Sequence, residues 1–192
     1  MNCRSDNRLV YFWRWSWLLL SLLMLAGQGC YESPFPLASS DREGIDARLL
    51  GSWIEVADSQ KDSPYQVVIH PFNDHEYLIA FTDAPGGKAV LARGFITTMD
   101  GVAIINLQGI DSLKPTDRTF LFFKYRITAQ GDLETWMIDH DSKLLEGVQL
   151  ADQAALYDFV QHHVRDPALY MPVRTFKPAK GVSMNLVPSG PA

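Results

Sequence analysis

The side chains best suited to chemistry in this chain of 192 residues are histidines and aspartates that lie close together in the sequence. Imidazole and carboxylate groups are common ligands of divalent metals, so each cluster is a candidate metal site. However, adjacent residues of a strand point to opposite faces, and adjacent residues of a helix lie about 100° apart. We therefore predict solvated polar residues and no metal site at the three clusters His70-Asp74-His75, Asp139-His140-Asp141 and His162-His163.

Motifs for catalysis are missing from the sequence. It contains no G-x-S-x-G and no H-E-x-x-H, and Glu55, Glu76 and Glu134 are dispersed over separate strand-like segments. The Gly-rich residues 85–88 resemble a phosphate loop only superficially, because a strand and not a helix is expected after them. These observations predict a non-enzymatic protein that has no catalytic residues and no cofactor.

Residues 1–29 have the pattern of a secretory signal peptide. Arg4, Arg8 and Arg14 precede an uncharged apolar run, Trp17–Gly27. As a helix this run reaches roughly 17 Å, well short of the ~30 Å hydrocarbon core, which favours a cleaved signal over an uncleaved anchor. Cleavage would leave 163 residues with 14 basic and 21 acidic side chains, a net charge of −7. Because no run of Lys or Arg is present, nucleic acid is not an expected partner.

The cleavage site itself carries a further signal. Gly27 and Gly29 place small residues at −3 and −1 of a cut before Cys30, and the cysteine at +1 resembles the lipobox of bacterial lipoproteins, although Gly27 stands where that family prefers Leu. In that family the thiol receives a diacylglycerol and the freed amine is usually acylated. Cys30 would otherwise be a single free thiol in an oxidising compartment. We therefore predict lipidation of Cys30 and a cell-envelope protein that faces the periplasm. Tyr31 at +2 is not the Asp associated with inner-membrane retention, which favours the outer membrane.

Beyond residue 44 the sequence is a succession of short segments rich in β-branched and aromatic residues. Short joints with turn residues, such as Asn73-Asp74 and Asp100-Gly101, require antiparallel neighbours. A sheet of at least seven such strands with one apolar face is expected to close on itself and so lose its edges. The predicted strands are Gly51–Asp58, Tyr65–Phe72, His75–Asp83, Lys88–Thr98, Val102–Leu107, Arg118–Thr128 and Asp132–His140.

The hydrophobic period changes after the seventh predicted strand. Within residues 150–164, Leu156, Phe159 and Val160 lie at helical spacing, which predicts a helix docked on the outside of the sheet with the histidines outside the barrel. A last strand, Tyr170–Lys177, would pair with the first. The predicted fold is mainly β: an antiparallel up-and-down barrel of about eight strands with one helix before the last strand.

The segment Leu50-Gly51-Ser52-Trp53 resembles the Gly-x-Trp opening of lipocalins, in which a short helical turn leads into the first strand and the Trp plugs the closed end of the barrel. In that family a basic residue of the last strand packs over the Trp, and the resemblance implies Arg174 for this role beside Trp53. The layout from about Leu49 to Lys177 is similar to uncharacterised bacterial lipocalin-like lipoproteins. The resemblance implies a fold and a ligand cup, and it transfers no catalytic residue.

The sequence is compatible with two functions. The protein is either a membrane-anchored lipoprotein that binds a small apolar or amphipathic ligand in a barrel cup, or an envelope protein-interaction module, such as an inhibitor or assembly factor, with a solid barrel. The aromatic residues Phe120, Phe122, Phe123, Tyr125 and Trp136 would line the cup or fill it, and Phe120 and Phe122 would alternatively pack under the helix. The predicted organisation is a signal peptide (1–29), a lipidated tether (30–44), a barrel domain (45–177) and a disordered tail (178–192).

Overall fold

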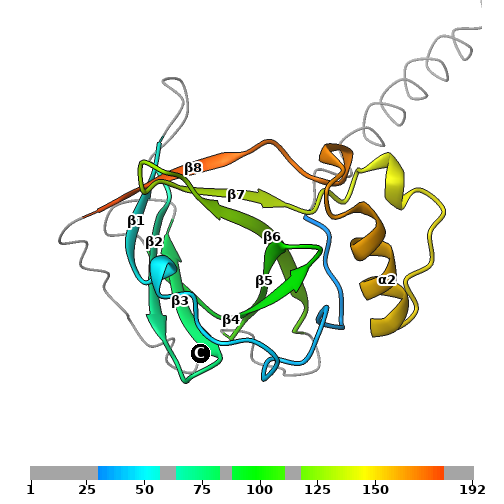
Figure 1. Ribbon diagram of the computed structural model, residues 1–192, viewed down its shortest axis with the longest axis horizontal. Coiled ribbons are helices and arrows are strands. Elements are labelled where there is room, and N and C mark those ends of the chain that lie inside the picture. The colour runs from blue at the N-terminus through cyan, green and yellow to red at the C-terminus, as the bar shows by residue number, and fades with distance from the viewer. Residues whose placement is uncertain (1–29, 57–63, 83–87, 111–117, 180–192) are drawn as a thin grey trace, which may run out of the picture.

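The strands of this protein close into one antiparallel barrel in which each strand pairs with its neighbours in sequence (Figure 1). The computed structural model describes residues 30–56, 64–82, 88–110 and 118–179, so the predicted signal peptide lies outside the described residues. The strands are β1 (Gly51–Glu55), β2 (Gln66–Pro71), β3 (Glu76–Thr82), β4 (Val90–Met99), β5 (Val102–Gly109), β6 (Phe120–Ile127), β7 (Leu133–Met137) and β8 (Arg174–Pro178). The predicted eight-stranded antiparallel barrel is confirmed.

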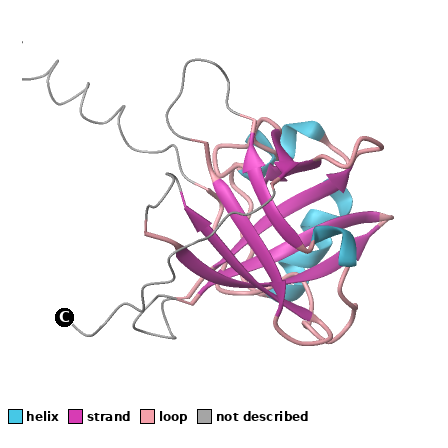
Figure 2. Cartoon of the chain, turned by 90° about the vertical axis from the view of Figure 1, so that its left-hand side faces the viewer, coloured by secondary structure: helices cyan, strands magenta, loops and turns pink. Residues whose placement is uncertain are grey.

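Closure depends on β8, which pairs with both β7 and β1. Phe176 lies opposite Leu133 on one side and opposite Glu55 on the other. Figure 2 shows the strands tilted across one another, as closure of a barrel requires. At one end the strands are joined by short turns, and the β4–β5 turn has positive φ at both Asp100 (49°) and Gly101 (75°). This geometry is the type I′ turn that suits a two-residue hairpin.

The two ends of the barrel differ in what lies over them. We call the end where β1, β3, β5 and β7 begin the closed end, because the short 3₁₀ helix η1 (Ala47–Leu49) precedes β1 there. We call the opposite end, where β2, β4, β6 and β8 begin, the open end. Three of the connections at the open end, residues 57–63, 83–87 and 111–117, lie outside the described residues.

The barrel interior contains the larger part of the hydrophobic core. Alternate residues of each strand point inward, so that every strand contributes buried side chains to one cluster. Gly94 of β4 lies against this cluster, and a Cβ atom there would be 2.9 Å from Ile79 Cδ1 and 3.3 Å from Ile105 Cγ2. The cluster consists of Leu49, Trp53, Ile69, Tyr77, Ile79, Ala92, Ile96, Ile105, Leu107, Tyr125, Leu133 and Phe176.

The helix α2 (Gln153–His163) packs on the outside of the barrel (Figure 1), as the spacing of its apolar residues predicts. The Asp152 carboxylate caps it by accepting a hydrogen bond from the Ala155 N–H at 2.8 Å. Leu156 and Val160 are fully buried and Phe159 partly buried in a second cluster, which also holds Phe122 of β6. Two 3₁₀ helices, η3 (Lys143–Leu145) and η4 (Pro167–Leu169), flank α2. Within the described residues no helix has the length and apolarity needed to cross a membrane.

Residues 30–44, predicted to be a tether, run in an extended course along the outside of the barrel (Figure 1). Ser33 exchanges two backbone hydrogen bonds with Phe120, at 3.1 and 2.7 Å. Farther along, Leu37 is 1% exposed, and its N–H donates to the buried Asn106 Oδ1 at 2.8 Å. The tether prediction is therefore wrong for this segment, because it covers apolar residues on the outer face of β5 and β6 that α2 does not reach.

The predicted boundary of the C-terminal tail also shifts. β8 includes Pro178, and the Ala179 N–H donates to the Ser52 carbonyl at 2.8 Å. The rest of the predicted tail, residues 180–192, lies outside the described residues.

Candidate functional site at the two ends of the barrel

Trp53 lies inside the barrel at the closed end. The side chain is 4% exposed, and its Nε1–H donates to the Leu49 carbonyl at 2.9 Å. Leu49, the last residue of η1, is itself fully buried in the same cluster. The hydrogen bond therefore ties η1 to the barrel and leaves no polar atom of the indole unpaired.

A polar cluster around Asp46 fixes the start of η1. The Asp46 N–H donates to the Tyr77 hydroxyl oxygen at 2.6 Å, and the Tyr125 hydroxyl donates to Asp46 Oδ2 at 3.1 Å. Arg48 donates to the same carboxylate through Nε at 2.9 Å and Nη2 at 2.7 Å. The hydrogen bond from Arg48 holds the pKa of Asp46 below its ordinary value.

The two tyrosines of this cluster are shifted in the other direction. Burial raises the pKa of Tyr77 to about 12. Burial also raises the pKa of Tyr125, and the nearby Asp46 charge adds to the shift. Both hydroxyls are therefore neutral hydrogen-bonding groups at physiological pH, suited to holding η1 in place and not to accepting a proton from a substrate.

The expected packing of Arg174 over Trp53 is not what the structure has. In the β1–β8 register Trp53 lies opposite Pro178, whereas Arg174 begins β8 at the open end. Four residues of strand separate the two positions, which is about 13 Å at ~3.3 Å per residue. Arg174 instead contacts Glu55, with Nη1 and Oε1 3.6 Å apart, and its guanidinium lies 4.9 Å from the centre of the Tyr65 ring.

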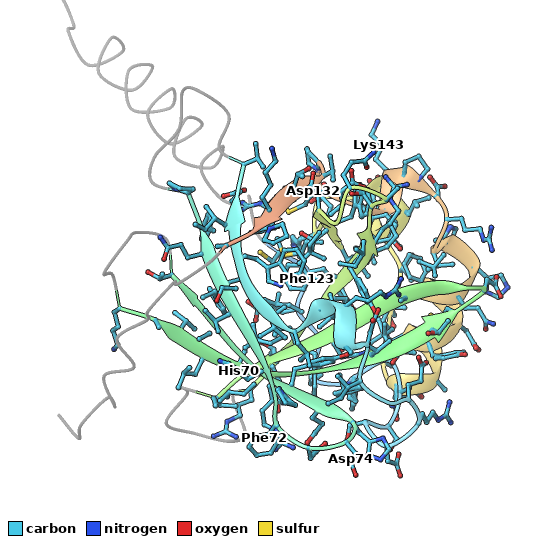
Figure 3. All side chains as sticks on the ribbon, turned by 60° about the vertical axis from the view of Figure 1, so that its left-hand side comes forward. His70, Phe72, Asp74, Phe123, Asp132 and Lys143 are labelled. Carbon is cyan, nitrogen blue, oxygen red and sulfur yellow. The ribbon has the colours of Figure 1, made fainter. Side chains whose placement is uncertain are left out.

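The inward side chains of the open end are apolar and incompletely buried. Val90 of β4 and Tyr65, the residue before β2, are 41% and 36% exposed, although both continue the inward-facing alternation of these strands. Phe81, Leu121 and Phe123 are half-buried and pack against the interior cluster. Figure 3 shows Phe123 enclosed by the strands. We call the inward apolar residues Tyr65, Phe81, Val90, Leu121 and Phe123 the mouth.

One ion pair lies at the edge of the mouth. Within the strands that the structure describes, Glu55 and Arg174 are the charged inward-facing residues of the open end, and they contact each other. The Arg174 side chain is 47% exposed and the Glu55 side chain 19%. The mouth thus offers an apolar surface with one exposed cation at its edge, which is the chemistry that an amphipathic molecule requires.

The depth available below the mouth is limited by the packing around Gly94. The Cβ contacts given above show that the barrel is filled at the level of Ile79 and Ile105. Two hollows are lined by described residues outside the barrel. One, of about 520 Å³, lies between Tyr31, His140 and Leu150, and the other, of about 210 Å³, lies between Pro36, Arg93 and Phe120.

The histidine clusters do not converge. His70, His75, His140 and His162 are exposed, and the His163 ring contacts the Phe159 ring at 4.8 Å between centres. Within the described part of the chain, no three His, Cys, Asp or Glu side chains are placed to hold a metal ion. The helix histidines lie outside the barrel, as predicted.

The aromatic residues divide between the two faces of the sheet. Phe123 and Tyr125 point into the barrel, whereas Phe120, Phe122 and Trp136 belong to the cluster on the outside. The contact between Leu37 and Asn106 was not predicted from the sequence. A signal for it exists in the sequence, because Asn106 interrupts an apolar run and a buried amide needs partners.

The chain was compared with known protein families, curated proteins and solved structures. No family model, no curated protein and no solved structure matches this chain significantly. The fold and the site define a closed antiparallel eight-stranded barrel with a half-exposed apolar mouth.

Proposed function

We propose that this protein is a non-enzymatic lipoprotein of the bacterial cell envelope, anchored through lipid on Cys30, and that the mouth of its lipocalin-like barrel binds an apolar or amphipathic ligand. The observation that carries the proposal is the exposure of Val90 and Tyr65 on the inward face of the open end. In a barrel whose interior is filled as far as the open end, an inward-facing valine would be buried. Val90 is instead accessible to a molecule that enters from the open end.

The form of the mouth favours a ligand with one polar end. Its apolar side chains would take a hydrocarbon group, and covering each Å² of apolar surface is worth about 25 cal/mol. Arg174 at the edge would pair with an anionic or strongly polar head group, since its guanidinium is exposed and already oriented by Tyr65 and Glu55. Because Gly94 and its neighbours fill the barrel below, the ligand would enter only partway.

The anchor is supported by the sequence and by accessibility. Cys30 follows a signal-like segment and is an exposed free cysteine at the start of the described chain. Replacing Cys30 by Ser should release the protein from the membrane fraction. A variant that remained wholly bound to the membrane would instead favour an uncleaved helix as the anchor.

The filled lower half of the barrel favours a second function, an envelope protein-interaction module such as an inhibitor or assembly factor. In that case the working surface would be on the outside, and the mouth would bind no small molecule. Binding of an apolar probe to the mouth distinguishes the two functions.

The test uses the mature chain carrying Cys30→Ser and the apolar fluorophore N-phenyl-1-naphthylamine as probe. Val90→Asp is compared with Val148→Asp, because Val148 is 40% exposed but lies in the η3–α2 connection, outside the barrel. Loss of one valine contact and burial of a carboxylate beside the probe should weaken binding about tenfold or more in Val90→Asp alone. Absence of probe binding, or equal loss in both variants, would reject the ligand function in favour of the interaction module.

A further inference from the structure

The start of the mature chain lies at the open end of the barrel. Cys30 is opposite Asp139, two residues beyond the end of β7, and Ser33 is opposite Phe120, the first residue of β6. The strands β6 and β7 begin and end, respectively, at the open end, so the predicted site of lipidation is beside the mouth and far from η1.

Cys30 has little freedom to move away from the barrel. The Tyr31 N–H donates to the Ile138 carbonyl at 3.4 Å, Glu32 accepts a hydrogen bond from the Thr119 hydroxyl at 2.7 Å, and Ser33 is paired with β6. An extended chain spans at most about 3.6 Å per residue, so Cys30 can move no more than roughly 10 Å from its last firm contact at Ser33.

Exposed apolar side chains gather at the same end. Val56 at the end of β1, Tyr65 before β2, Val90 in β4 and Val173 before β8 are between 36% and 48% exposed. These four residues form what we call the rim. At the closed end, by contrast, Phe72 in the β2–β3 turn is the large exposed hydrophobic residue among those described.

We propose that the rim lies against the phospholipid bilayer that holds the lipid on Cys30, so that the barrel is oriented with its mouth toward the membrane. This inference rests on the lipid anchor of the proposed function. A ligand would then pass between the bilayer surface and the mouth without crossing the periplasm, which fits an apolar or amphipathic molecule.

Charge does not drive this contact. The net charge of the mature chain is −7, which repels anionic lipid head groups. The short anchor and the apolar rim supply the attraction, and a rim of isolated valines and one tyrosine suits the interfacial region of a bilayer better than its centre. The orientation should therefore persist at high salt concentration.

The experiment places a fluorophore at either end of the barrel of the lipidated mature protein. Val90→Cys and Phe72→Cys provide a matched pair of exposed apolar sites at the open and closed ends. Lipid on Cys30 blocks its thiol, and Cys3 leaves with the signal, so a nitrobenzoxadiazole maleimide labels only the new cysteine. Each protein is reconstituted in phosphatidylethanolamine–phosphatidylglycerol vesicles with and without nitroxide-labelled head groups. The protein can insert with its barrel outside or inside the vesicle. In a parallel sample, a reductant added outside destroys the fluorescence of the outward-facing molecules and so gives their fraction. Only the signal of this outward-facing fraction is compared.

We expect at least a twofold loss of fluorescence at position 90 and little change at position 72. Equal quenching at both ends, or stronger quenching at position 72, would overturn the orientation. Val173→Cys is a second rim site if Val90→Cys does not fold. Mass spectrometry of the N-terminal peptide separates the two proposals: an unlipidated peptide contradicts the anchor itself, whereas a lipidated protein with equal quenching contradicts the orientation alone.

Discussion

Replacing Trp53 by Ala should destabilise the barrel strongly. The indole is 4% exposed, fills the barrel below η1 and donates to the Leu49 carbonyl at 2.9 Å. Removal of a large aromatic side chain from a core costs about 3–5 kcal/mol. The freed Leu49 carbonyl adds roughly 1–3 kcal/mol if no water reaches it, so we expect a loss at the upper end of the first range.

Trp53→Phe separates the two contributions. It keeps the larger part of the apolar side chain and removes the Nε1–H donor, so we expect a smaller loss of about 1–2 kcal/mol. Urea unfolding of the mature Cys30→Ser chain, with an unchanged m value, measures both variants. Val56→Ala, at a site 48% exposed, is the control and should stay within about 0.5 kcal/mol of the parent. A loss below about 1 kcal/mol for Trp53→Ala would refute the assignment of Trp53 as the plug of the closed end.

Three further predictions follow from burial. Asn106→Ala removes the acceptor of the buried Leu37 N–H and should cost about 2 kcal/mol, with faster hydrogen exchange at the Leu37 amide and not at amides of β1. Burial raises the pKa of Tyr77 to about 12, above the ~10 of an unfolded tyrosine. The contribution of this shift to the free energy of unfolding is therefore complete below pH 10 and is lost as the pH rises toward 12. Tyr77→Phe should reduce this alkaline loss of stability, as measured by urea unfolding at a series of pH values. Leu156→Ala, at a fully buried position of α2, should cost about 2–5 kcal/mol by thermal or urea unfolding, and a cost near zero would mean that α2 is not docked.

Much of the barrel was predictable because its strands are short, alternate cleanly and are joined by diagnostic turns. Asp100-Gly101 adopts the expected hairpin turn, and Leu156 and Val160 bury the stripe that their spacing predicts. Strand ends moved by up to four residues, as at the last strand, where Tyr170 forms only an isolated bridge with Ile138. Propensity does not set such boundaries, since the partner strand decides where pairing stops.

The role of Arg174 could not be deduced in the same way. Which residue of the last strand lies beside Trp53 depends on the β1–β8 register, and a single sequence gives no information on this register. The register shows that Pro178 takes that position, four residues along the strand. The exposure of the mouth could not be predicted either. The alternation of apolar residues assigns Val90 to the inward face of its strand, but it does not indicate whether other residues cover that position.

The docked course of residues 30–44 was missed because its prolines and serines carry no periodicity. The sequence of the barrel did contain a reason for it: the outer face of β5 and β6 is apolar at Ile104 and Phe122, both fully buried, and a helix of 11 residues covers only part of such a face. A strand that is apolar on both faces requires a cover on each. Alternation can reveal this requirement, but it does not identify which segment of the chain supplies the cover.

The free energy that holds residues 30–44 on the barrel decides whether a lipid anchor on Cys30 and the barrel would move together. Freeing the segment exposes Leu37, which is 1% exposed when docked, and breaks its hydrogen bond to Asn106. Exposing one leucine costs about 1.5–3 kcal/mol, and one hydrogen bond about 1 kcal/mol. The segment also exchanges two backbone hydrogen bonds with β6 through Ser33, and Ala38 is 3% exposed, so several contacts together oppose the chain entropy that release would regain. Lipid on Cys30 would therefore constrain the position of the mouth for most of the time, whereas a free tether of 15 residues would let the barrel turn in any direction.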